Sequence, residues 1–126
     1  MRQLFRDAIE EEGHAVVEAE DAGAALHILR NQTVHLAILD IQMPGTNGLE
    51  LLERIHKSWR HVPVILCSGL PKLFNEYAVW EAMDQIAGLF SKPVEVRGLL
   101  DCVARALRAP GAAAPAAPSP TPIGVL

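Results

Sequence analysis

Apolar residues follow two alternating patterns along the first 108 residues. Short apolar runs without polar alternation, typical of strands buried on both faces, occur over residues 15–19, 34–40, 64–67 and 88–91. Apolar residues at helical spacing, with charges between them, predict helices over residues 2–12, 21–30, 49–59, 75–87 and 96–107. Strands that alternate with helices of this length predict an α/β fold built on a parallel sheet.

This pattern ends near Ala109. The following segment, PGAAAPAAPSPTPIGVL, has recurrent prolines that prevent a continuous helix and has no apolar period. We therefore expect one globular domain over residues 1–108 and a disordered tail rich in alanine and proline over 109–126. The stretch from Ile123 to Leu126 is apolar enough to dock on another part of the protein.

The composition and charge of the chain argue against several classes of protein. The chain of 126 residues has a formal net charge of −4 and shows no basic stripe, which argues against nucleic-acid binding. No apolar run approaches the roughly 20 residues of a membrane span, and acids at the start exclude a signal peptide, so we expect a cytoplasmic protein without a membrane partner.

The cysteines and histidines show no metal-binding pattern. Cys67 lies in an apolar run and Cys102 on a helical pattern, and without a Cys-x-x-Cys pair both are interpreted as buried thiols. The five histidines are scattered, and we expect them at the surface or in loops; they are His14, His27, His35, His56 and His61.

The candidate chemistry lies where the expected strands end. Asp40 closes the strand over 34–40 and is followed by a loop rich in turn residues, while Ser68 and Lys92 close two further strands. The carboxyl ends of parallel strands share one edge of the sheet, where ligands collect. At this edge Asp, Lys and Ser would supply a nucleophilic oxygen, a cation and a hydroxyl donor. Each residue taken singly also has a structural interpretation, as a turn, cap or solvated strand-end residue.

The segment DIQMPGTNG, which begins at Asp40, resembles the Asp-x-x-Met-Pro-x-x-Asn-Gly signature of the receiver domains of bacterial response regulators. The resemblance covers residues 1 to about 108. It implies a flavodoxin-like, doubly wound parallel sheet with strand order 2-1-3-4-5. It also implies a histidine kinase or phosphotransfer protein as phosphodonor and a downstream protein as partner.

The resemblance assigns roles residue by residue. Asp40 matches the phosphoacceptor and Ser68 matches the hydroxyl that turns toward the phosphoryl group. Lys92 matches the lysine that pairs with the acceptor, across what is often a cis bond to Pro93. The family binds Mg²⁺, for which the carboxylate of Asp40 and the backbone carbonyl of Gln42 match two ligands. Leu89 stands where the family usually has an aromatic switch residue, although Phe90 follows it.

The start of the chain departs from the family pattern. Receiver domains begin with a hydrophobic strand that ends in a pair of Mg²⁺-binding acids, whereas this chain begins inside the first expected helix. We therefore expect a truncated domain whose first strand, central in the sheet, is missing. Either Met1 is not the true start, or the apolar tail end or a strand of a second molecule fills the gap, the latter giving a homodimer. If the flanking strands instead pair directly, Glu20 and Asp21 move toward Asp40 and partly replace the acids.

Three functions compete at this point. The first is a single-domain response regulator that accepts a phosphoryl group on Asp40. The alternative is a degenerate receiver fold that is never phosphorylated and serves as a protein-interaction module, because Mg²⁺ has too few protein ligands. A small hydrolase with Asp40 as nucleophile is weakest, because no second acid or histidine is indicated, so we expect no enzyme.

Overall fold

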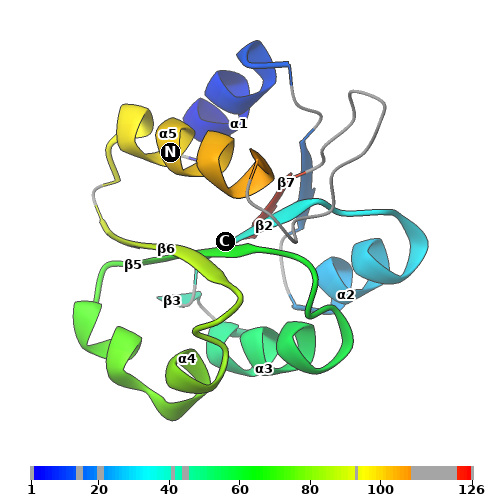
Figure 1. Cartoon of the computed structure of the whole chain (residues 1–126), viewed down its shortest axis with the longest axis vertical. Coiled ribbons are helices and arrows are strands. Elements are labelled where there is room, and N and C mark those ends of the chain that lie inside the picture. The colour runs from blue at the N-terminus through cyan, green and yellow to red at the C-terminus, as the bar shows by residue number, and fades with distance from the viewer. Residues whose placement is uncertain are drawn as a thin grey trace.

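The fold is a parallel sheet with helices on both faces. A computed structural model describes the backbone of residues 2–13, 16–19, 22–40, 42–43, 46–92, 94–108 and 122–125. In Figure 1, α1 (Arg2–Glu11) and α5 (Val96–Arg108) lie above the sheet, and α2 (Ala22–Asn31), α3 (Gly48–Ser58) and α4 (Tyr77–Glu81) lie below it. This arrangement confirms the doubly wound α/β fold.

The main sheet has five parallel strands in the order β1-β7-β2-β5-β6. Their bounds are β1 (Val17–Ala19), β2 (Leu36–Asp40), β5 (Val64–Ser68), β6 (Ile86–Ser91) and β7 (Pro122–Val125). A separate two-stranded antiparallel ribbon, β3 (Gln42–Met43) with β4 (Thr46–Asn47), follows β2. A short 3₁₀-helix, η1 (Pro71–Asn75), precedes α4.

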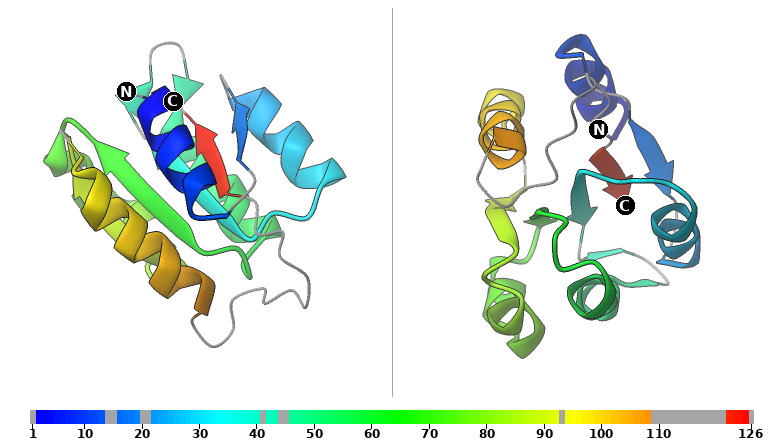
Figure 2. Two further views of the ribbon diagram at one scale, coloured as in Figure 1. Left: turned by 90° about the horizontal axis from the view of Figure 1, so that it is seen from above. Right: turned by 45° about the vertical axis from the view of Figure 1, so that its right-hand side comes forward.

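Part of the expected tail forms a strand in the middle of the sheet. Figure 2 shows β7, drawn in red, between β1 and β2. The prediction of a disordered tail is wrong for residues 122–125, whose apolar sequence provides a strand with a partner on each side. Residues 109–121 lie outside the described part of the chain. The expectation that the tail end fills a central gap is confirmed for these four residues.

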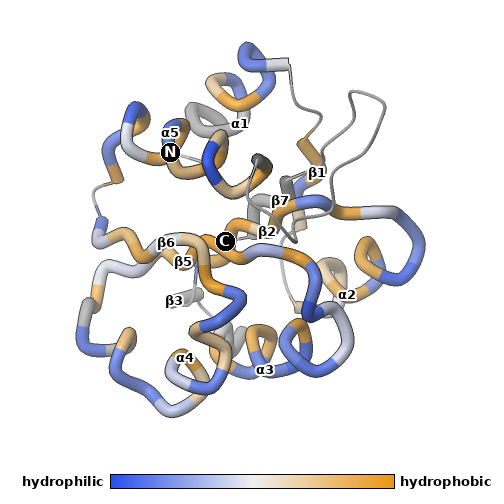
Figure 3. Tube along the Cα trace, viewed as in Figure 1, coloured by the Kyte–Doolittle hydropathy of each residue, from blue (hydrophilic) through white to orange (hydrophobic). Residues whose placement is uncertain are grey.

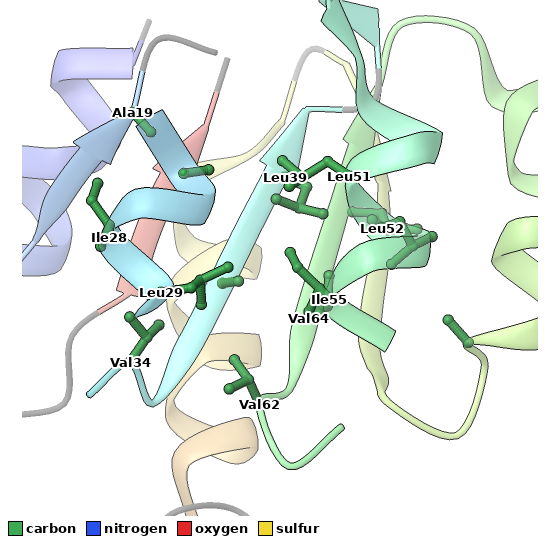
Figure 4. Packing of buried hydrophobic residues seen from close by; sticks show 14 of the residues in the cluster. Ala19, Ile28, Leu29, Val34, Leu39, Leu51, Leu52, Ile55, Val62 and Val64 are labelled. Carbon is green, nitrogen blue, oxygen red and sulfur yellow. The ribbon is translucent and has the colours of Figure 1, made fainter. Parts of the chain in front are cut away.

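Two hydrophobic cores hold the layers together, one on each face. The larger core joins β2 and β5 to the lower helices, and Figure 4 shows Leu51, Leu52 and Ile55 of α3 pointing at Leu39 and Val64. The smaller core packs alternate residues of the same strands against α1 and α5; it includes Ile9, Leu36, Ile38, Ile65, Leu99 and Val103. Every residue of β2 and β5 is buried, which explains why both strands read as continuous apolar runs.

The predicted helix over residues 75–87 is wrong in length. The structure instead has η1, the short α4 and, from Ile86, strand β6. Val79 is buried, but Tyr77, Trp80 and Met83 are exposed, so the apolar spacing around α4 does not form a single buried face. Figure 3 shows orange and blue stretches alternating along this part of the chain.

Two histidines are buried; His35 lies in the loop before β2, whereas His56 lies in α3, contrary to the expectation of surface or loop positions. Within the described part of the chain, His35 Nδ1 has no hydrogen-bond partner. In His56 of α3, the Nδ1 atom lies 3.0 Å from Gln85 Oε1. Its Nε2 atom lies 3.1 Å from a guanidinium nitrogen of Arg60. Because Oε1 can only accept and guanidinium can only donate, this geometry fits a neutral His56 with its proton on Nδ1.

Gln85 extends this network to the main chain. Its Nε2 donates to the carbonyl oxygens of Trp59, at 2.7 Å, and Val62, at 2.8 Å. Gln85 is itself buried. One amide side chain therefore joins α3, the turn that follows it, and the start of β6.

Candidate functional site

The carboxyl ends of three parallel strands bring the candidate residues to one edge of the sheet. Asp40 ends β2 and is the register partner of Cys67 in β5, while Ser68 ends β5 and is the register partner of Ser91 in β6. Lys92 follows β6 directly, and its backbone N–H donates to the Ser68 carbonyl at 2.9 Å. The shared register thus places Asp40, Ser68 and Lys92 together, as their positions in the sequence indicate.

Asp40 and Lys92 form an ion pair. The Lys92 Nζ donates to Asp40 Oδ2. The Asp40 side chain is 7% exposed, whereas that of Lys92 is 34% exposed. The carboxylate is therefore held at the bottom of the site, and the ammonium group lies over it with access to solvent. A cation so placed can screen the charge of an anion that approaches Asp40.

Ser68 is placed near this pair but makes its hydrogen bonds within its own loop. Its Oγ donates to the Leu70 carbonyl at 3.1 Å and accepts from the Leu70 N–H at 2.9 Å. Ser68 is fully buried. Its hydroxyl would have to give up these local bonds before it could donate to a group on Asp40.

Cys67 lies beside Asp40 in the sheet, and this position was not predicted from the sequence. Burial, assisted by the Asp40 charge and opposed by Lys92, raises the pKa of the Cys67 thiol to about 12. Burial also raises the pKa of the Cys102 thiol on α5. Both cysteines are free and buried, which confirms the interpretation as thiols. The register pairing of Asp40 with Cys67 is the signal that identifies this neighbour, and it requires the sheet topology.

We expect the Cys67 thiol to resist alkylation in the folded protein. At pH 8, a Cys102→Ala variant, which keeps only this thiol, should react with iodoacetamide about 10³-fold more slowly than the same variant in urea, because only the thiolate reacts. Equal rates of alkylation in buffer and urea would contradict the buried placement.

The raised pKa of the Cys67 thiol also makes stability depend on pH. Since the folded-state pKa lies above the ordinary value of 9.0, the stability due to the protonated thiol is complete below pH 9 and decreases toward pH 12.

The described residues do not assemble a site for a divalent cation. Among them, no group of three or more His, Cys, Asp or Glu side chains could hold a metal ion. Gln42 follows Asp40 closely, as the first residue of β3. Glu20, Asp21 and Pro93 lie outside the described residues. Because β7 separates β1 from β2, the direct pairing that would bring Glu20 and Asp21 toward Asp40 does not occur. Of the candidate Mg²⁺ ligands, the Asp40 carboxylate at the end of β2 and the main chain of Gln42 lie within the described residues.

Leu89 and Phe90 alternate across β6. Leu89 is 40% exposed, whereas Phe90 is partly buried in the core beneath α5 and pairs in register with Cys67. The aromatic ring of Phe90 therefore lies on the face opposite to Leu89. It does not replace an aromatic side chain at the Leu89 position.

Comparison with known proteins points to one family. The sequence model of the family described as "Response regulator receiver domain" matches residues 1–104. Response regulator protein FleR of Pseudomonas aeruginosa is 39% identical over 106 residues, which are 83% of this chain and 22% of FleR. Sensor histidine kinase AruS of the same species is 31% identical over 121 residues, 91% of this chain and 11% of AruS. The chain thus spans a small part of the length of these relatives.

Solved structures of similar proteins share the fold. A CheY-like receiver domain protein of Methanospirillum hungatei has a TM-score of 0.74 at 31% identity, covering 82% of this chain and 81% of its own. Response regulator protein TrrA of Thermotoga maritima, crystallised with Mg²⁺ and BeF, has a TM-score of 0.74 at 27% identity, covering 84% and 89%.

A parallel sheet that ends in Asp40, Ser68 and Lys92 thus coincides with a family match over most of the chain. Within the described residues, no helix is long and apolar enough to cross a membrane. The chain belongs to the response regulator receiver domain family of two-component signalling.

Proposed function

We propose that residues 1–108, with β7 completing their sheet, form a phosphoacceptor module in which Asp40 accepts a phosphoryl group from a histidine kinase or a phosphotransfer protein. One observation carries the proposal. The carboxylate of Asp40 is buried at the carboxyl end of β2 and is paired with Lys92, whose side chain is 34% exposed. The charge of Lys92 would attract an anionic phosphodonor toward this carboxylate.

The transfer needs one bond to form and one to break. An oxygen of Asp40 attacks phosphorus, and an O–P bond forms while the N–P bond to the histidine of the donor breaks. The electron pair of that bond stays on the imidazole nitrogen. Lys92 would then contact an oxygen of the transferred group, and Ser68 would donate its hydroxyl proton to another after releasing Leu70. Signalling to a downstream protein follows from this change at the sheet edge.

Labelling with a small phosphodonor tests the proposal. With acetyl phosphate and Mg²⁺ in the buffer, the full chain should gain one phosphoryl group, detected as a single added mass by intact mass spectrometry. Asp40→Asn should abolish the added mass, because the amide is not a nucleophile for this reaction. Asp84→Asn, a matched change at an exposed residue, should leave labelling unchanged.

Two results would contradict the assignment of Asp40 as the phosphoacceptor. Equal labelling of Asp40→Asn and the unmodified chain would place the acceptor elsewhere. No labelling of a folded unmodified chain would instead favour a receiver fold that acts as an interaction module without phosphorylation.

A further inference from the structure

The central strand β7 comes from a segment far from its neighbours in sequence. Ile123 pairs in register with Val17 of β1 on one side and with Ala37 of β2 on the other. Val125 likewise pairs with Ala19 and Leu39. The backbone of β7 is therefore hydrogen-bonded on both edges. The space between β1 and β2 accepts a parallel strand of four residues.

The path of the chain fits insertion from within the same molecule. The connection β2-α3-β5 moves toward β6 with its helix on the face of the larger core. The connection β6-α5-β7 moves back across the sheet with its helix on the opposite face. Reversing both the direction and the face leaves the handedness unchanged, so both connections have the same hand, as parallel sheets require.

The length of the connection also fits. Three strand spacings of about 4.8 Å separate β6 from β7, which gives roughly 14 Å across the sheet. The connecting residues 109–121, about 13 in number, can extend over about 40 Å. α5 runs antiparallel to the strands and so ends at the edge where β7 starts. The connection is therefore long enough for residues 122–125 to reach their place.

The composition of β7 makes it a weak central strand. Pro122 has no N–H to give to the ladder and is tolerated because it is the first residue of the strand. Gly124, paired with Glu18 and Ile38, brings no side chain to pack and loses much entropy on ordering. The fully buried strand β5 has neither residue type. Two of the four residues of β7 are therefore poor strand formers.

We propose that the space between β1 and β2 is a strand-acceptor site that residues 122–125 of the same chain occupy exchangeably. The ligand class is an extended apolar peptide that binds parallel to both neighbours. The site differs from the candidate phosphoacceptor, and its occupancy can be measured without any phosphoryl transfer. Failure of one proposal therefore leaves the other intact.

Strand exchange in the full chain tests this proposal. A protease site placed within residues 109–121 is cut after folding, and size-exclusion chromatography with mass spectrometry determines whether the released segment stays bound. A fluorescein-labelled peptide of residues 119–126 is then added in excess. We expect the segment to co-elute after cutting and the labelled peptide to replace it, with one peptide bound per chain by fluorescence anisotropy.

A matched pair of peptides distinguishes strand pairing from nonspecific hydrophobic binding. A Gly124→Pro peptide, which lacks an N–H needed in the ladder, should bind at least tenfold more weakly than the unmodified peptide. Because this change is made in the peptide, the cut protein itself is unaltered. In the intact chain, Gly124→Pro should increase amide exchange in β1 and β2, whereas Ala116→Pro in the connection should not.

Three outcomes would overturn the proposal. Equal binding of the two peptides would show that no ladder forms. Loss of the cut segment without a change in amide exchange at Ile38 would show that β7 does not pair with β2. A dimer of the uncut protein whose segments are exchanged between copies would assign the occupant to a second molecule.

Discussion

Replacing Gln85 by Leu should lower the free energy of unfolding by about 2–4 kcal/mol, because it leaves buried polar groups without partners. The change removes the acceptor of His56 Nδ1 and the donor to the Val62 carbonyl. The Trp59 carbonyl keeps a bond from the Val62 N–H, at 3.1 Å, and so contributes less to the loss. Urea unfolding, followed by the fluorescence of Trp59 and Trp80, measures the effect.

Two further variants identify the cause. Asp84→Leu makes the same side chain at an exposed neighbouring position and should change stability by less than about 0.5 kcal/mol. The double variant His56→Leu, Gln85→Leu should recover part of the loss, because the unpaired imidazole is gone as well. If Gln85→Leu unfolds at the same urea concentration as the unmodified chain, this network does not contribute to stability.

Replacing Lys92 by Met should slow the labelling of Asp40 by acetyl phosphate about 100-fold, the loss expected when one charge-stabilising donor is removed. Met keeps most of the length of the side chain and removes the ammonium group that pairs with Asp40 Oδ2. The incoming phosphoryl group then meets the buried carboxylate without the Lys92 ammonium group to screen their repulsion. Time courses of intact mass at fixed donor concentration give the rate.

Lys72→Met is the matched control, because Lys72 of η1 is an exposed lysine. It should label at the rate of the unmodified chain. Thermal unfolding of both variants verifies that a slow rate reflects chemistry rather than loss of the fold. An unchanged rate in folded Lys92→Met would remove Lys92 from the proposed transfer and leave its pairing with Asp40 a structural one.

Local signals made the three site residues predictable. Asp40, Ser68 and Lys92 each follow an apolar run and precede turn residues, so a parallel sheet has to collect them at one edge. The bonds of the Ser68 hydroxyl to Leu70 match the turn interpretation that the sequence also allowed for this residue.

Contacts between residues far apart in the chain could not be predicted from the sequence, nor could the side of a helix that another element covers. His56 and Gln85 are 29 positions apart, and neither residue type by itself indicates a buried pair. Trp80 has helical apolar spacing with Val79 and Met83, but spacing does not reveal which side of a helix another element covers. The tail strand was hidden by the prolines around it, although the need for a central strand indicated where one would bind.

The position of β7 also determines when the sheet can be completed during synthesis. Its pairing partner Val17 is roughly 100 positions earlier in the chain than Ile123, which gives the centre of the sheet contacts of very high sequence separation. Strands β2, β5 and β6 can pair as soon as they leave the ribosome, whereas β1 waits until residues 122–125 have been made. Until then, the nascent chain carries the unpaired edges of β1 and β2, on which neighbouring chains can associate. The risk of aggregation therefore lasts from the emergence of β1 and β2 until this one short segment is inserted between them.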